Sequence, residues 1–318
     1  MALFKLKPAF KDYLWGGTRL RDDFGKKCDF DKVAESWELS CHKDGDSTVS
    51  TGSDKGLTLR QYIEKYGKAV LGTDCERFEN FPVLIKLIDA KDNLSVQVHP
   101  DNEYAMRVEG EYGKTEMWYI VDCDEGAELL YGFKHEISKE EFASRIADNT
   151  LLEVTNNVPV HKGDVFFIEA GTLHAIGKGI LIAEIQQNSN TTYRIYDYGR
   201  VGKDGKPREL HVEKAKDVTR LAPAKQYPET PIEQHEGYTS KLMASCEYFS
   251  ASVLDIESSA ELDADEKSFN HLLFLEGEGS VSDGRDSVPF KKGDSVFITA
   301  ETGKYTVSGK CRAVLTKV

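Results

Sequence analysis

The chain has 318 residues, of which 40% are apolar and 30% are charged, so it can form one large hydrophobic core or two smaller ones and is not a disordered protein. Its 41 basic and 54 acidic side chains give a net charge of −13, and such a surface repels phosphate backbones and anionic lipid. We therefore expect neither nucleic acid nor a membrane as a partner. A few Lys and Arg side chains in one pocket could still bind a small anionic substrate.

The cysteines and the N-terminus indicate the compartment. No two of the six cysteines form a close CxxC pair, so they supply neither a zinc knuckle nor a redox motif, and a disulfide framework is not expected at this length. Lys5, Lys7, Pro8 and Lys11 interrupt the N-terminal segment. No apolar run approaches the roughly 20 residues that a membrane span needs. We predict a cytoplasmic protein.

Short β-rich runs, cut by Gly, Asp and Asn, make up most of the chain. We expect strands at 81–90, 94–100, 116–121, 164–170, 180–187 and 270–279. Capping boxes at Thr58 with Gln61 and at Ser138 with Glu141 predict two helices, and the segment 100–109 predicts a third. Many strands and few helices favour a mostly β fold, either a sandwich or a barrel.

An internal repeat organises the chain. The segment that starts at His161 (HKGDVFFIEAGTLHAI) aligns without a gap with the one that starts at Lys291 (KKGDSVFITAETGKYTV), and 114–121 aligns with 269–276. A Pro-, Gln- and Glu-rich stretch between the copies is typical of a linker. We predict a catalytic domain at 1–225, a linker at 226–240 and a second domain at 241–318.

The two copies differ at polar positions that would face inward. His174 in the first copy aligns with Lys304 in the second, and Glu116 aligns with His271. A repeat that keeps its turn glycine and its apolar positions but changes these residues keeps the fold and loses the site. We therefore expect the C-terminal unit to be structural.

A candidate metal site lies in the first copy. Strand alternation puts Gln97 and His99 on one face, Lys114 and Glu116 share a face of the next strand, and His174 follows a glycine turn. Two imidazoles, a carboxylate and an amide oxygen can hold one divalent cation with open positions for water or substrate. Zn²⁺ suits these donors best, and Mn²⁺, Fe²⁺ and Co²⁺ fit nearly as well. Spacing alone leaves the alternative open that these are ordinary core residues, and the difference between the repeats favours the metal.

Several motifs occur in a specific order over some 200 residues. They are Tyr13-Leu-Trp15-Gly-Gly17, Ala34-Glu-Ser-Trp37-Glu, Phe81-Pro-Val-Leu-Ile-Lys86, Ser95-Val-Gln-Val-His-Pro-Asp101, Gly113-Lys-Thr-Glu116-Met-Trp-Tyr119, Ala170-Gly-Thr-Leu-His174-Ala and the run from Glu184 to Asp197. In these motifs the chain resembles the type I mannose-6-phosphate isomerases of the short bacterial form, which belong to the cupin superfamily. The resemblance implies two cupin (jelly-roll) β-barrel units, with a few short helices inserted in the N-terminal one.

The resemblance also implies roles for individual residues. Gln97, His99, Glu116 and His174 fall on the zinc ligands of the family, with one Zn²⁺ per chain, and Arg194 falls on its active-site arginine. The implied reaction interconverts mannose 6-phosphate and fructose 6-phosphate, two phosphosugars. Arg194 would stabilise the anionic intermediate, and Lys114 would handle a proton or contact the phosphate. The sequence assigns no general base.

Two further residues are candidates for substrate binding. Lys86 interrupts an apolar strand, and a buried amine needs a partner, which could be the phosphosugar or a structural carboxylate. Trp15, before two glycines, could stack on sugar or could belong to the core. For Arg194 the alternative to an active-site role is a structural ion pair with a nearby carboxylate.

Two other functions fit part of the pattern. Cupins with two histidines and one carboxylate also form Fe²⁺-dependent dioxygenases, which would not need Arg194 or a lysine-rich pocket. A phosphosugar-binding cupin without turnover would usually carry a DNA-binding or signalling module, and the sequence contains none. The sequence does not indicate an oligomeric state.

Overall fold

The structure, a computed structural model, describes residues 2–202 and 205–318. It is mostly β, as predicted. A six-stranded sheet runs in the order β12 (Val165–Ile168), β9 (Glu116–Cys123), β14 (Ile180–Gln187), β7 (Val83–Ala90), β3 (Glu35–Leu39) and β2 (Ala9–Lys11). A five-stranded sheet runs in the order β11 (Thr155–Pro159), β10 (Glu128–Phe133), β13 (His174–Ala175), β8 (Val96–Val98) and β15 (Tyr193–Tyr196).

The largest sheet belongs mainly to the C-terminal part. Its main path is β16 (Ile232–His235), β17 (Tyr238–Ser245), β18 (Ser250–Ile256), β24 (Cys311–Lys317), β20 (Asn270–Ser282), β22 (Ser295–Ile298), β1 (Leu3–Lys7) and β6 (Thr48–Val49). Off this path, β19 (Ser259–Ala264), β21 (Ser287–Lys291) and β23 (Gly303–Ser308) pair with one another or with β20, and β4 (Cys41–His42) pairs with β5 (Gly45–Asp46). No sheet closes into a barrel in the described part of the chain, so the predicted pair of barrels is not confirmed.

The helices of the described residues are short and precede the C-terminal sheet strands. They are α1 (Arg19–Asp22), α2 (Leu59–Tyr66), α3 (Asn102–Val108), α4 (Lys139–Ala147) and α5 (Val212–Val218), with 3₁₀ turns η1 (Lys68–Leu71), η2 (Thr73–Cys75) and η3 (Leu151–Glu153). The Thr58–Gln61 capping box opens α2 as predicted, and the Ser138 side chain accepts a hydrogen bond from the Glu141 backbone N–H at the start of α4. All six predicted strands are present, with ends shifted by a few residues.

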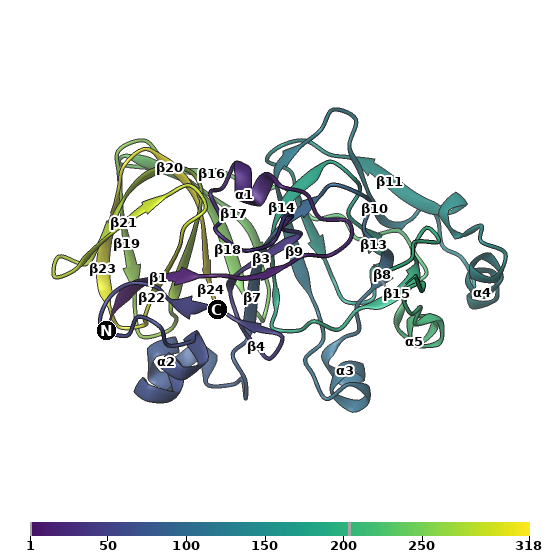
Figure 1. Ribbon diagram of the computed structural model, residues 1–318, viewed down its shortest axis with the longest axis horizontal. Helices are drawn as coiled ribbons and strands as arrows, with labels where there is room; N and C mark the ends of the chain where they lie inside the picture. The colour runs from purple at the N-terminus through teal and green to yellow at the C-terminus, as the bar shows by residue number, and fades with distance from the viewer. Residues whose placement is uncertain (1, 203–204) are drawn as a thin grey trace.

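The N-terminal segment of the chain contributes strands to both of the lobes that Figure 1 shows. β1 pairs antiparallel with β22, with Phe4 opposite Phe297, and so lies in the sheet of the C-terminal lobe. The chain then enters the other lobe, where β2 pairs with β3. The predicted boundaries at 225 and 240 stay a prediction, but β1 makes the two lobes interdependent.

The repeat is visible in the hydrogen bonds of its two turns. The N–H of Gly163 donates to the Ile120 carbonyl at 2.8 Å, and that of Gly293 donates to the Phe274 carbonyl at 2.7 Å. Both glycines have positive φ, of 95° and 87°, which favours glycine at this turn position. The two turns therefore have the same construction.

This construction corrects the alignment of Glu116 with His271. Because Ile120 corresponds to Phe274, Glu116 corresponds to Asn270, one residue earlier. A gap-free alignment of two apolar strands does not detect such an offset, which turns every side chain to the other face. His271 is fully buried, and its neighbours Leu273 and Leu275 belong to a core cluster that contains residues of both lobes. The interior of the C-terminal lobe contains Asn270 instead, whose amide donates to the Tyr305 hydroxyl at 2.9 Å.

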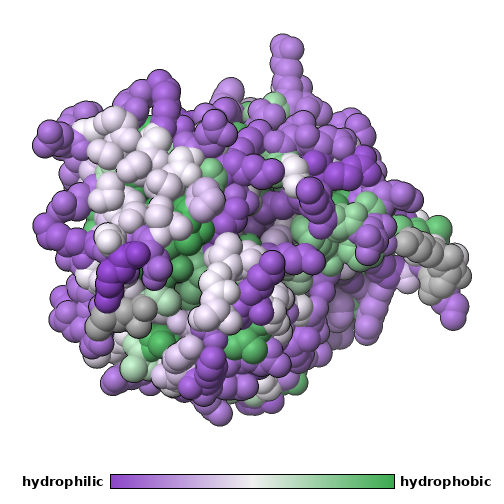
Figure 2. Space-filling model, turned by 60° about the vertical axis from the view of Figure 1, so that its left-hand side comes forward, coloured by the Kyte–Doolittle hydropathy of each residue, from purple (hydrophilic) through white to green (hydrophobic). Residues whose placement is uncertain are grey.

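The surface is largely polar. Figure 2 shows hydrophilic side chains over most of one face, with pale and apolar patches between them. Within the described residues, no helix is long and apolar enough to cross a membrane. The apolar residues form several internal clusters, and one of them fills the space between the six-stranded and five-stranded sheets. The predicted site residues lie at this same place.

Candidate active site and metal centre

Three of the predicted ligands converge between the two sheets. His174 lies on β13, and His99 follows β8, while Glu116 opens β9 in the facing sheet. The Nε2 atoms of His99 and His174 are 3.1 Å apart, and each lies within 3.6 Å of a Glu116 carboxylate oxygen. All three side chains are buried, with an exposed fraction of at most 1%.

The second nitrogen of each imidazole is already engaged. His99 Nδ1 lies 3.0 Å from the Thr191 carbonyl, and His174 Nδ1 lies 2.8 Å from the Thr172 carbonyl. A carbonyl only accepts, so each Nδ1 carries the proton and each Nε2 turns a lone pair toward Glu116. Metal-binding histidines are oriented in this way.

The electrostatics of the cluster suit a cation. Burial opposes ionisation of Glu116, but the charge of Lys114 leads the interactions that outweigh it and hold the pKa of this carboxyl well below its usual range. Both Glu116 oxygens are buried without a hydrogen bond among the described residues. Burial and the Lys114 charge lower the pKa of His99 to about 3, so the ring is neutral at pH 7. An anionic carboxylate and two neutral imidazoles are the protonation states that a divalent metal requires.

Gln97 completes the set. It lies on β8 between His174 on β13 and Arg194 on β15, and both are its register partners. Its Nε2 is 3.4 Å from His174 Nε2, and Ser95 Oγ is 3.4 Å from its Oε1. All four predicted ligands therefore lie close together, and three of them, His99, Glu116 and His174, form a group that could hold a metal ion.

A row of alternating charges continues from the cluster. Lys114 Nζ lies 2.9 Å from Glu116 Oε2 and 3.7 Å from Glu184 Oε1. Lys86 Nζ lies 3.1 Å from the same Glu184 oxygen and 3.9 Å from Glu35 Oε2. Burial and the Glu116 charge raise the pKa of Glu184. The Glu184 carboxyl group is therefore protonated more readily than that of an ordinary glutamate.

A cavity of about 240 Å³ opens beside this row. Its lining comprises both sheets and the loops at their ends: Tyr13, Trp15, Glu35, Lys86, Ile88, Leu94, Ser95, Gln97, Lys114, Ile176, Glu184, Asn190, Thr192, Arg194 and Arg208. It therefore contains one predicted ligand and every other residue predicted for the site. Trp15 is 4% exposed and belongs to the core cluster between the sheets, so its indole is both cavity wall and core.

The arginine end of the cavity carries excess positive charge. Arg194 Nε donates to Ser95 Oγ at 3.3 Å and Nη1 donates to the Glu209 carbonyl at 2.8 Å. No carboxylate in the described chain lies within ion-pair distance of Arg194, which argues against a structural ion pair. Arg208 donates to Asp197, and Arg200 shares that same carboxylate. One carboxylate thus pairs with two guanidinium groups, Arg200 and Arg208.

Sequence reasoning missed Glu35, Glu184 and Arg208 as site residues. Glu184 offered a signal: it interrupts the apolar strand β14, as Lys86 interrupts β7, and Glu184 and Lys86 are register partners. Arg208 offered none, because its loop brings it to the cavity through tertiary structure.

Comparisons with known proteins agree with this geometry. Residues 3–129 match the family model of the type I phosphomannose isomerase catalytic domain, and residues 238–318 match that of the mannose-6-phosphate isomerase cupin domain. Over 310 residues the chain is 39% identical to the mannose-6-phosphate isomerase ManA of Bacillus subtilis, covering 97% of this chain and 96% of the relative. It is 38% identical over 288 residues to the mannose-6-phosphate isomerase of Streptococcus mutans, covering 90% and 88%. The crystal structure of the mannose 6-phosphate isomerase from Bacillus subtilis superimposes with a TM-score of 0.94 at 38% identity over 100% of both chains.

Proposed function

The chain belongs to the type I mannose-6-phosphate isomerase family, and from this premise we propose that it interconverts mannose 6-phosphate and fructose 6-phosphate with a divalent metal, Zn²⁺, held by Gln97, His99, Glu116 and His174. The convergence of two imidazole Nε2 atoms on one buried carboxylate carries the metal part of this proposal. The protein is an isomerase, and the family has a phosphosugar substrate.

The donor set supports zinc. Zn²⁺ accepts both imidazole nitrogen and carboxylate or amide oxygen, and four protein ligands leave room for substrate oxygens when coordination expands. When bound, the ion would act as a Lewis acid toward the sugar carbonyl and hydroxyl oxygens.

The charge balance of the cavity supports a phosphosugar. Lys86, Lys114, Arg194 and Arg208 line the cavity together with Glu35 and Glu184, and Glu116 lies next to Lys114, so the side chains alone are within one charge of neutral. A divalent ion would make the site cationic in a protein whose net charge is −13. The guanidinium of Arg194 has no carboxylate partner among the described residues, and Arg208 shares its carboxylate with Arg200. We propose this end of the cavity for the phosphate, because guanidinium binds phosphate in a bidentate manner.

Proton transfer needs a group that can both give and take a proton between C1 and C2 of the sugar. Glu184 is the candidate for this role, because it lines the cavity and burial raises its pKa above the ordinary value of a glutamate. Lys114 contacts both Glu184 and Glu116 and can stabilise negative charge on the substrate oxygens. We propose Glu184 as the acid and base, with Lys114 and Arg194 as the groups that stabilise the enediolate.

Turnover and metal content measured on the same sample test the proposal. The purified protein should convert mannose 6-phosphate in a coupled assay and contain about one Zn²⁺ per chain. A chelator should remove activity, and Zn²⁺ should restore it better than Fe²⁺ does. Oxygen uptake with Fe²⁺ would indicate the dioxygenase alternative, and phosphosugar binding without turnover would indicate the sensor.

The cysteines support the cytoplasmic location that we propose for the enzyme. All six are free thiols in the structure, which is typical of a reducing compartment.

A further inference from the structure

The loop 188–192 touches both the cavity and the metal cluster. It joins β14, which carries Glu184, to β15, which carries Arg194. Asn190 and Thr192 line the cavity, and the carbonyl of Thr191 between them accepts the Nδ1 proton of His99 at 3.0 Å. The position of this loop therefore decides which nitrogen of His99 is free to bind a metal.

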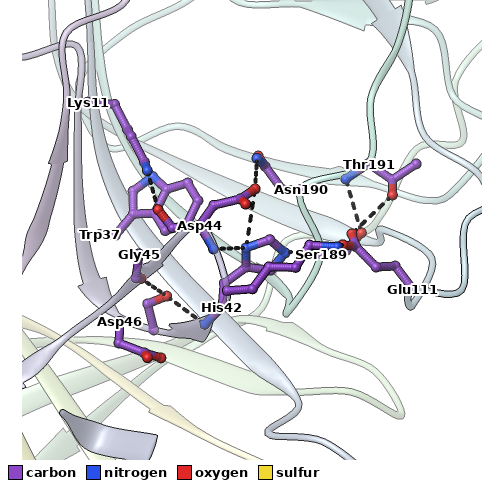
Figure 3. A network of polar contacts seen from close by, with 12 residues as sticks. Lys11, Trp37, His42, Asp44, Gly45, Asp46, Glu111, Ser189, Asn190 and Thr191 are labelled. Carbon is purple, nitrogen blue, oxygen red and sulfur yellow. Dashed lines mark hydrogen bonds and ion pairs between the residues drawn. The ribbon is translucent and has the colours of Figure 1, made fainter.

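Two carboxylates from other segments hold the loop, as Figure 3 shows. Asp44 Oδ2 accepts a hydrogen bond from the Asn190 amide at 2.8 Å. Glu111 Oε2 accepts one from the Thr191 hydroxyl at 3.3 Å. Neither Asp44 nor Glu111 lines the cavity, so both act on the site only through the loop.

His42 lies between these two carboxylates. Its Nδ1 accepts a hydrogen bond from the Asp44 backbone N–H at 3.1 Å, and its Nε2 lies 3.7 Å from Glu111 Oε1. The side chain is only 5% exposed, and its ring packs edge-on against Trp37 with the centroids 5.7 Å apart. Because Nδ1 is an acceptor, the neutral ring carries its proton on Nε2, directed toward Glu111.

The imidazole ring of His42 is neutral in the folded protein. Burial lowers the pKa of His42 even though Glu111 and Asp44 would raise it. The exposed Lys43 supplies the opposite charge to Glu111 instead. His42 is thus a rigid, uncharged spacer between the two carboxylates and forms part of no cavity wall.

We propose that His42 is a positioning residue of the isomerase, which holds loop 188–192 through Asp44 and Glu111 so that Thr191 keeps the Nδ1 proton of His99. The inference rests on the proposed metal site and extends it by a chain of contacts from His42 to His99. Groups that orient a metal-binding histidine typically matter by 10-fold to 100-fold in metal affinity or activity. We expect an effect of that size although His42 contacts neither ligand nor substrate.

The test compares His42→Gln, Glu111→Ala and the double variant with the wild type. Glu111→Ala leaves Trp37 untouched, so it separates the effect on the loop from any effect through the indole. The exposed His161→Gln is the matched control, because it removes an imidazole that lies at the surface beside Asp164. Metal-free proteins are titrated with Zn²⁺ against a chromophoric chelator, and kcat and KM are measured on the reloaded samples.

Both single variants should bind Zn²⁺ about 10-fold to 100-fold more weakly and lose kcat by a similar factor, with KM changed by no more than about twofold. The double variant should lose no more than the worse single variant, since both act on one loop. Long-range ¹H–¹⁵N spectra of the metal-free proteins should show His99 protonated on Nδ1 in the wild type and as a mixture of tautomers in the variants. His161→Gln should match the wild type in every measurement.

Unchanged Zn²⁺ affinity in Glu111→Ala, or losses that add in the double variant, would overturn the role of His42. If His42→Gln does not fold, Glu111→Ala and the spectra decide alone. If the wild type binds no Zn²⁺, the metal proposal fails, while the His99 tautomer in the same samples still decides whether His42 positions the loop.

Discussion

Lys86 Nζ lies 3.1 Å from Glu184 Oε1 across the pairing of β7 with β14. The lysine that interrupts an apolar strand is therefore neutralised by a carboxylate of the neighbouring strand. Burial alone would lower the pKa of Lys86, but Glu35 and Glu184 outweigh it and raise the pKa, so the amine is charged. A structural partner thus exists, and the predicted role of Lys86 in substrate binding stays a proposal beside it.

We predict that Lys86→Met destabilises the protein strongly. Both side chains are almost completely buried, so the substitution leaves the Glu184 carboxylate without its nearest cation. Removing one partner of a buried pair typically costs about 3 to 5 kcal/mol. Urea unfolding of the metal-free protein measures the loss. The double variant Lys86→Met with Glu184→Gln should recover part of it, and the exposed Lys304→Met should cost less than about 0.5 kcal/mol.

The metal ligands carry the second prediction. His99→Ala and His174→Ala each remove one of two imidazoles, so Zn²⁺ content should fall and isomerase activity should drop by more than about 100-fold. Metal analysis and a coupled assay check this, and circular dichroism confirms the fold. His271→Ala should leave turnover per folded molecule nearly unchanged, because His271 is a buried residue of β20 that contacts Ser295 and is not one of the predicted ligands. Equal loss of activity in that variant would mean that the metal site is wrongly placed.

The sequence allowed most of the site to be predicted because polar residues are conspicuous in apolar strands. Gln97, His99, Glu116 and His174 alternate with buried residues or follow a glycine turn, and strand geometry brings such side chains together. Glu184 was missed although β14 shows the same signal as β7. His42 and Glu111 could not be found, since they reach the site through a loop whose course depends on tertiary contacts.

Pairing between strands that are distant in the sequence could not be predicted. Local patterns predicted the strands, but nothing near Leu3 indicates that β1 pairs with Ile298 at the opposite end of the chain. The repeat was detectable because its turn needs glycine at Gly163 and Gly293. The register of the repeated strands could not be detected from the sequence. Both β9 and β20 carry apolar side chains on both faces, so their sequences align almost equally well after a shift of one residue.

Arg194 carries the third prediction. Its guanidinium has no carboxylate partner in the described chain, so we expect it to stabilise charge that develops on the substrate. Arg194→Ala should lower kcat by roughly 100-fold to 1,000-fold, as for the loss of one oxyanion donor. Zn²⁺ content should stay within about twofold of the wild type. Steady-state kinetics and metal analysis in parallel check both numbers.

Arg194→Lys distinguishes charge from geometry. A lysine restores the charge but lacks the planar set of donors, one of which binds Ser95 in the structure while another would bind a substrate oxygen under our proposal. We expect it to recover only a minor part of the lost rate. Near-normal turnover of Arg194→Ala would show that the arginine only supports the loop at Glu209.

His271 carries the last prediction, which concerns stability rather than catalysis. Burial and the nearby Lys26 lower the pKa of His271 from its ordinary 6.5 to about 3, so the unfolded chain binds a proton below pH 6.5 that the folded protein does not. The contribution of His271 to the free energy of unfolding is fully present above pH 6.5 and decreases as the pH falls toward 3. Between pH 7.5 and 5.5 the decrease is about 1.4 kcal/mol. Other buried histidines add to the total, so the test is the difference between the wild type and His271→Gln, which cannot titrate but can still reach Ser295. Urea unfolding of both metal-free proteins at the two pH values should show a smaller loss in the variant, by about 1.4 kcal/mol. An equal loss in both would mean that His271 is protonated in the folded protein. The buried ring would then need an anionic neighbour that outweighs the charge of Lys26.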